Sequence, residues 1–158
     1  MCSKRRERSD PFSPPSRIMG LDVGKKRIGV AVSDHLGWTA QGAGVIDRTR
    51  PDWMQRLEEL IEENGVGAIV VGLPRNMDGS VGPRGKACQD LARRLEDRFS
   101  LPVILWDERL STVAAERTLL SADMSRIKRR KVIDQIAACW ILQGYLDAQR
   151  RKQNDEKP

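Results

Sequence analysis

The sequence lacks the features that would place it in several large protein classes. No apolar run reaches the roughly 18 residues that a membrane-spanning helix needs, and no apolar segment follows the basic N-terminus as it would in a secretory signal. The three cysteines are widely spaced and form no Cys-x-x-Cys pair, which argues against both disulfides and a zinc site. We therefore expect a cytoplasmic protein with reduced thiols and no membrane partner.

Histidine and aromatic residues are also scarce. The single histidine, His35, has no catalytic motif around it, so a serine or cysteine nucleophile activated by histidine is not supported. Four Trp, two Phe and one Tyr leave little aromatic surface on which nucleic-acid bases could stack. Extensive readout of a base sequence by stacking is therefore not expected.

The net charge of +6 resides mainly in the two ends of the chain. Residues 1–17 contribute +3 and residues 149–158 contribute +2, whereas residues 18–148 carry only +1. Solvated tails explain such terminal charge as well as a nucleic-acid-binding role does. A basic run over residues 126–131 is more specific, because five of its six side chains are Lys or Arg.

The order of the predicted elements indicates one α/β domain. We predict a disordered basic leader over residues 1–16, the domain over 17–148 and a polar tail over 149–158. Strands are predicted at 17–23, 27–34, 41–47, 68–72 and 103–106, and helices at 51–63, 84–99, 111–120 and 132–149. Short turns join the first three strands, and helices separate the later ones.

This order predicts a mixed five-stranded sheet, with three antiparallel strands followed by two parallel strands and with helices on both faces. The layout is that of the ribonuclease H-like fold. Nucleases, polynucleotide transferases and actin-type kinases share it, so the layout alone does not decide function.

Three acidic residues occupy places where a folded protein would not put a carboxylate for solubility alone. Asp22 interrupts an apolar strand, Glu108 ends another strand, and Asp134 opens the last helix, one position off its apolar stripe. Carboxylates about 4 Å apart repel by roughly 4 kcal/mol per pair at an effective dielectric near 20, so a cluster requires shared protons or a divalent cation. Oxygen ligands favour Mg²⁺ or Mn²⁺. Asp134 could instead complement the helix dipole.

Basic residues that lie near these acids in the sequence, or in a loop expected to lie over the same crevice, are candidates for contacts with phosphate groups. They are Lys25, Lys26 and Arg27 in the turn after Asp22, Arg75 and Arg84 around a Gly- and Pro-rich segment, Arg109, and Arg129, Arg130 and Lys131 before Asp134. Arg109 could equally pair with a local acid. The segment between Arg75 and Arg84 contains Asp78 and Gly79, which favour a turn over a ligand site.

Four stretches of the sequence carry a family resemblance. They are Gly20-Leu-Asp-Val-Gly-Lys-Lys-Arg-Ile-Gly-Val-Ala-Val-Ser-Asp34, Gly72-Leu-Pro-Arg-Asn-Met-Asp-Gly79, Asp107-Glu-Arg-Leu-Ser-Thr112 and Asp134-Gln-Ile-Ala-Ala-Cys-Trp-Ile-Leu-Gln143. Together they closely resemble the YqgF family of bacterial Holliday-junction-resolvase-like proteins, over roughly residues 17–148. The resemblance implies a nuclease that matures the precursor of 16S ribosomal RNA, with Asp22, Glu108 and Asp134 as catalytic metal ligands.

Alternatives remain at this point. The same acids could serve an endonuclease that cleaves structured DNA such as a Holliday junction, which would need two symmetric sites and hence a homodimer. The chain could also be a non-catalytic module that binds RNA or the ribosome. An ATP-dependent phosphotransferase is disfavoured: Gly20-x-Asp-x-Gly24 also resembles an actin-type phosphate loop, but the chain is too short for the second domain of such proteins.

Overall fold

The structure is a computed structural model that describes residues 17–107 and 126–156, with side chains described for residues 133–152 of the last helix. The leader expected over residues 1–16 and the helix expected at 111–120 lie outside the described residues. None of the helices in the described ranges is long and apolar enough to cross a membrane.

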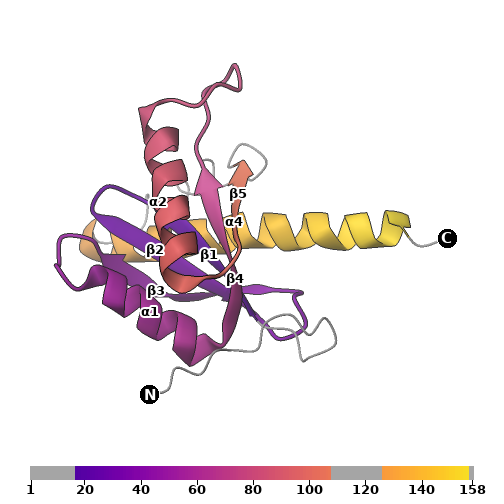
Figure 1. The fold of residues 1–158 in the computed structure, drawn as a ribbon, viewed down its shortest axis with the longest axis horizontal. Coiled ribbons are helices and arrows are strands. Elements are labelled where there is room, and N and C mark those ends of the chain that lie inside the picture. Colours follow the sequence, from indigo (N-terminus) through magenta and orange to yellow (C-terminus); the bar gives the residue numbers. More distant parts are fainter. Residues whose placement is uncertain (1–16, 108–125, 157–158) are drawn as a thin grey trace.

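Five strands form a single mixed sheet (Figure 1). They are β1 (Arg17–Val23), β2 (Arg27–Ser33), β3 (Ala40–Asp47), β4 (Val66–Leu73) and β5 (Val103–Asp107), in the spatial order β3-β2-β1-β4-β5. The pairs β1·β2 and β2·β3 are antiparallel, whereas β1·β4 and β4·β5 are parallel. The predicted fold is confirmed. Because β1, β4 and β5 are parallel, their carboxyl ends share one edge of the sheet, and Asp22 and Asp107 both lie there.

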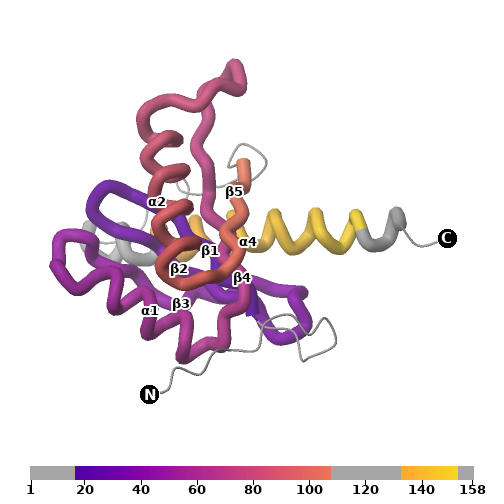
Figure 2. The backbone as a smooth tube through the Cα atoms, viewed as in Figure 1, coloured from indigo at the N-terminus to yellow at the C-terminus, as the bar shows by residue number. Residues whose placement is uncertain are grey.

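Helices cover both faces of the sheet, as the backbone trace in Figure 2 also shows. Helices α1 (Trp53–Asn64) and α2 (Pro83–Phe99) cover one face, and α4 (Arg126–Glu156) crosses the other. The residues of β1 alternate between the two layers. Met19 and Leu21 pack beneath α1 and α2, whereas Gly20 faces α4.

Helix α4 differs from the prediction in its bounds and in its buried face. It begins at Arg126 and ends at Glu156, so it includes the basic run and continues beyond residue 149. Asp134 therefore lies about two turns inside the helix, and the proposal that it opens the helix and complements its dipole is wrong. The fully buried residues Ala137, Ala138, Ile141 and Leu142 follow it at helical spacing. Asp134 consequently lies on the buried face and not one position off it.

Glycines on the sheet allow α4 to approach it closely. A Cβ added at Gly20 would lie 2.6 Å from Leu142 Cβ, one at Gly42 would lie 2.6 Å from Gln135 Oε1, and one at Gly29 would lie 1.9 Å from the Asp134 carbonyl oxygen. Side chains at these positions would hold the helix away from the sheet. Their absence brings the backbone of α4 directly onto β1, β2 and β3.

Replacing Gly29 tests this close approach. In Gly29→Ala the new methyl group would meet the backbone of Asp134, so the strand or the helix must shift. Overpacking of this kind typically costs about 1–3 kcal/mol, and we expect at least that loss in the free energy of unfolding measured with urea. Gly82→Ala is the control, because its nearest neighbour would lie 3.6 Å away, and it should cost less than about 1 kcal/mol. Equal losses in both variants would contradict the packing described here.

Candidate active site

A pocket of about 320 Å³ lies where the end of β1, the turn from β1 to β2, the start of α2 and α4 meet. Its lining contains two of the three predicted acids and four of the predicted basic residues. The lining residues are Asp22, Gly24, Lys25, Lys26, Arg27, Arg84 and Asp134. Residues from three separate regions of the sequence therefore converge at the carboxyl edge of the sheet.

Asp22 reaches this pocket from the interior of the sheet. It pairs with Gly29 across β1 and β2, and residues paired in this way project to the same face of a sheet. Gly29 faces α4, so the Asp22 carboxylate also projects toward that helix. Its exposed fraction is only 6%. A carboxylate so strongly buried is costly unless it is paired, hydrogen-bonded or bound to a cation.

Asp134 is held by an ion pair with Arg27. Arg27 Nε donates to Asp134 Oδ2 at 2.8 Å, and the side chains are 33% and 20% exposed. Sequence analysis predicts Arg27 as a phosphate contact, whereas the structure gives it a protein carboxylate as partner. Arg27 thus fixes the orientation of one acid and offsets the repulsion between Asp134 and Asp22.

The turn between β1 and β2 presents two lysines beside the acids. The Gly24 amide donates to the Arg27 carbonyl at 2.8 Å, and a side chain at Gly24 would meet that carbonyl. Arg48 Nη1 donates to the Gly24 carbonyl at 2.7 Å and holds the turn from outside. Lys25 and Lys26 remain exposed. Sequence analysis does not reveal Arg48, because no local pattern links it to a turn more than 20 residues earlier.

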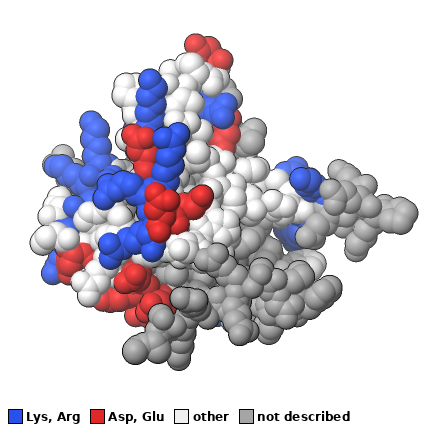
Figure 3. All heavy atoms as spheres, viewed as in Figure 1, with Lys and Arg blue, Asp and Glu red and all other residues white. Residues whose placement is uncertain are grey.

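Positive charge gathers around this part of the molecule. In Figure 3, Lys and Arg side chains extend over the region of the β1–β2 turn and α2, with Asp and Glu side chains among them. Arg84, in the first turn of α2, lines the pocket. The overall charge of +6 is a poor guide to this arrangement, since it derives mainly from the two ends of the chain.

Arg75 does not contribute to the pocket lining in the described residues. It lies in the loop between β4 and α2, with its Nε 3.9 Å from Asp107 Oδ2 at the end of β5. The same loop contains the predicted turn: Gly79 has a φ of +89°, and Asp78 Oδ1 accepts a hydrogen bond from the Ser80 amide at 2.9 Å. Arg75 thus lies at the carboxyl edge of the sheet, beside β5.

The remaining predicted site residues are not tested by the structure. Glu108 and Arg109 follow β5 directly and lie outside the described residues, and Arg129, Arg130 and Lys131 belong to the first turns of α4, for which only the backbone is described. Within the described ranges, no three His, Cys, Asp or Glu side chains are grouped to bind a metal. The two acids of the pocket offer carboxylate oxygens as donors.

Comparison with known proteins identifies relatives over most of the chain. The model of a family described as "RuvX: Holliday junction resolvase" matches residues 16–148. A protein of Geobacillus sp. (strain WCH70) named "Putative pre-16S rRNA nuclease" is 59% identical over 137 residues, which are 85% of this chain and 99% of that protein. A protein of Bacillus pumilus (strain SAFR-032) with the same name is 56% identical over 135 residues, 84% of this chain and 98% of its own length.

Two solved structures share the fold. RuvC of Thermus thermophilus in complex with a Holliday junction substrate has a TM-score of 0.51 at 15% identity, covering 85% of this chain and 96% of that chain. The Holliday junction resolvase Ydc2 of yeast mitochondria has a TM-score of 0.51 at 14% identity, covering 92% and 83%. At these identities the comparison supports the architecture of the sheet and helices alone.

A double-mutant cycle tests the ion pair in the pocket. We expect Arg27→Gln and Asp134→Asn to show a coupling of about 1 kcal/mol in the free energy of unfolding, because both side chains are partly withdrawn from water. Arg56→Gln and Glu59→Gln form the control pair on the exposed side of α1, where a coupling below about 0.5 kcal/mol is expected. A coupling between Arg27 and Asp134 no larger than the control would contradict a stabilising contact between the two side chains.

Proposed function

We propose that this chain, which belongs to the RuvX (YqgF) family, is a nuclease that hydrolyses phosphodiester bonds in the pocket between β1 and α4. Family membership confirms the resemblance carried by the four sequence motifs. The observation that carries the proposal is the meeting of Asp22 and Asp134 in one pocket with Lys25, Lys26 and Arg84. Acids can hold a catalytic cation, and the surrounding bases can hold the phosphates on either side of the scissile bond.

The acids of the pocket fit a hard divalent cation. Asp22 and Asp134 offer carboxylate oxygens, which Mg²⁺ and Mn²⁺ prefer over nitrogen or sulfur. We propose that these two residues hold the cation together with Glu108, which directly follows β5 in the sequence. When bound, the cation would supply Lewis-acid activation of water and stabilisation of the negative charge that develops on the phosphoryl group.

The basic residues of the pocket have a separate task. Lys25, Lys26 and Arg84 would bind phosphate groups and fix the strand relative to the acids, without reading its sequence. We include Arg129, Arg130 and Lys131 in this surface, because they occupy the turn of α4 that precedes Asp134. We also include Arg109, which follows Glu108 in the sequence. Arg75 is the weakest member, since Asp107 already lies beside it.

The substrate that we propose is the precursor of 16S ribosomal RNA, on the strength of the names of relatives that are 56% and 59% identical. Such a substrate would place the protein in the cytoplasm.

The family description also keeps a Holliday junction as the second candidate substrate, and that activity would require a homodimer. The non-catalytic RNA- or ribosome-binding reading predicts intact binding without cleavage. An ATP-dependent phosphotransferase is still disfavoured. The resemblance to a phosphate loop includes Gly20, and close packing of Leu142 against Gly20 accounts for a glycine at this position.

Asp22→Asn tests the assignment of the pocket. The change removes one charge and no volume, so the fold should persist while Mg²⁺-dependent cleavage of the RNA precursor is lost. Loss of a residue that merely supports a metal ligand costs 10–100-fold, so loss of a ligand should lower the rate by at least about 100-fold. Asp90→Asn on the exposed side of α2 is the matched control and should cleave at the parent rate. Parent-like cleavage by Asp22→Asn would exclude Asp22 as a ligand.

Replacing both Lys25 and Lys26 by Ser tests the basic surface. Affinity for RNA should fall alike for every sequence, because phosphate contacts carry no base information. The slope of log affinity against log salt should flatten by roughly 0.7 for each phosphate that the variant no longer neutralises. The control removes the same charge from the exposed middle of α2 as Arg93→Ser and Arg94→Ser. If the control flattened the slope as much as the lysine double variant, the strand would not be bound at the pocket.

A further inference from the structure

The turn between β2 and β3 presents an exposed indole at the edge of the sheet opposite the active-site pocket. Trp38 is 54% exposed and its neighbour Leu36 is 75% exposed. No other aromatic side chain in the described ranges is comparably exposed. A single exposed apolar side chain is common on protein surfaces and does not indicate a function. The contacts that surround Trp38 are therefore the evidence to consider.

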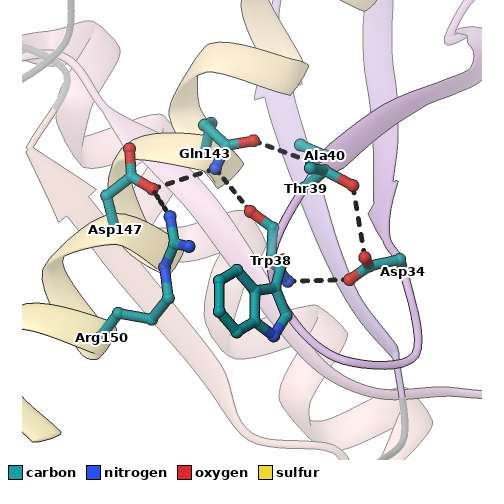
Figure 4. Close-up of polar contacts among 7 residues, drawn as sticks. All are labelled: Asp34, Trp38, Thr39, Ala40, Gln143, Asp147 and Arg150. Carbon is teal, nitrogen blue, oxygen red and sulfur yellow. Dashed lines mark hydrogen bonds and ion pairs between the residues drawn. The ribbon is translucent and has the colours of Figure 1, made fainter.

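The backbone around Trp38 is fixed from two sides (Figure 4). On one side, the Trp38 amide donates to Asp34 Oδ1 at 2.8 Å, and this bond contributes most to a lowered pKa of the Asp34 carboxyl. On the other side, Gln143 of α4 donates from Nε2 to the Trp38 carbonyl at 2.8 Å and accepts from the Ala40 amide at 2.9 Å. The backbone that carries the exposed indole is therefore held in place by a local contact and by contacts of Gln143 that span more than 100 residues of sequence.

A guanidinium is held beside the indole in the same way. The Arg150 guanidinium carbon lies 4.9 Å from the centroid of the Trp38 ring. Asp147 forms an ion pair with Arg150 and accepts a hydrogen bond from Gln143 Nε2 at 3.0 Å. One chain of contacts thus links Trp38, Gln143, Asp147 and Arg150 (Figure 4). Holding groups in place before a ligand arrives lowers the entropic cost of binding it.

A pocket of about 360 Å³ opens between this turn and α4. Its lining combines apolar side chains with one guanidinium, and includes Ile18, Leu36, Trp38, Tyr145, Leu146 and Arg150. Arg17 contacts His35 at 2.8 Å near the amino end of β1, and Arg151 and Lys152 are exposed on the following residues of α4. Two acids, Asp34 and Asp147, stand against the four cationic side chains of Arg17, Arg150, Arg151 and Lys152. The surface therefore carries surplus positive charge.

We propose that this Trp38 pocket is a second binding site for an unpaired nucleotide of the RNA substrate, an inference that rests on the proposed nuclease function. The base would stack on the indole, and Arg150, Arg151 and Lys152 would contact the adjoining phosphates, as in proteins that bind single strands. A second copy of this chain would use the apolar lining but would meet the same positive charge. An RNA strand fits both features.

The position of the pocket indicates how the strand would run. Gln143 follows Asp134 by nine residues of α4, which corresponds to about 13 Å along the helix axis. A single strand several nucleotides long could therefore occupy both the active-site pocket and the Trp38 pocket. The second site would hold the strand and take no part in the chemical step.

Nucleic-acid binding and cleavage are measured separately to test this proposal. The probe is a single-stranded oligoadenylate of about six nucleotides, titrated without divalent cations by fluorescence anisotropy. Trp38→Ala should weaken its binding by about 5-fold to 100-fold, the usual range for one stacked base, and Trp38→Phe should restore most of the affinity. In cleavage of the RNA precursor, Trp38→Ala should raise KM and leave kcat unchanged, because the indole lies outside the active site. Met77→Ala is the control for an exposed apolar side chain and should change neither quantity.

Further outcomes distinguish the possible failures. Arg150→Gln keeps the indole and should also weaken oligoadenylate binding, which provides a second variant if Trp38→Ala does not fold. Unchanged affinity in both folded variants would overturn the second site while leaving the nuclease proposal intact. The variants could bind oligoadenylate more weakly while the parent protein cleaves neither RNA nor a junction. That combination would support the second site and reject the nuclease proposal. If sedimentation shows that Trp38→Ala converts a dimer into a monomer at unchanged RNA affinity, the pocket is a protein interface and the proposal is wrong.

Discussion

The close approach of α4 to the sheet is the constraint on which the candidate site depends. At Gly20, Gly29 and Gly42 no side chain stands between β1, β2 or β3 and the helix, and a Cβ at any of the three would meet α4 within 2.6 Å. Glycine within strands weakens them, but here the vacated surface is filled by Ala137, Ala138, Ile141 and Leu142, all fully buried. Without this contact, Asp134 could not share a pocket with Asp22, whose strand partner is Gly29. Packing of the core and placement of the acids thus have the same physical origin.

Charge balance within the pocket is the second organising feature. Two carboxylates at the edge of an apolar sheet would repel each other, and four basic residues surround them. Arg27 is committed to Asp134, which leaves Lys25, Lys26 and Arg84 for a ligand of negative charge. The local arrangement therefore suits a polyanion such as a nucleic acid. Its phosphate groups would contact both the basic side chains and a cation held by the acids. Such contacts to phosphate groups would carry no information about base sequence.

Much of the fold can be predicted from the sequence, because its strands and turns leave local signals. Alternating apolar residues and the short turn at Gly24 predict β1 and β2, and the change to alternating helices and strands predicts the parallel pairing of β4 and β5. The start of α4 leaves no such signal, because a run of Arg and Lys has no apolar periodicity. The predicted apolar stripe of α4 is right in part: Ala137 and Ile141 are fully buried as expected, whereas Ala138 and Leu142 take the buried positions instead of Trp140, which is only partly buried. The contacts of Arg27 with Asp134 and of Trp38 with Gln143 join residues more than 100 positions apart, and no local pattern encodes them.

The central claim is that Asp22 and Asp134 form one metal-binding site, and its most direct measurement is anomalous diffraction from crystals soaked in Mn²⁺. Manganese takes the oxygen ligands that magnesium takes and can be located by its own scattering. The account predicts an anomalous peak in the pocket, within coordination distance of both carboxylates. A peak elsewhere on the molecule, with the pocket empty in a protein that cleaves RNA under the same conditions, would contradict it.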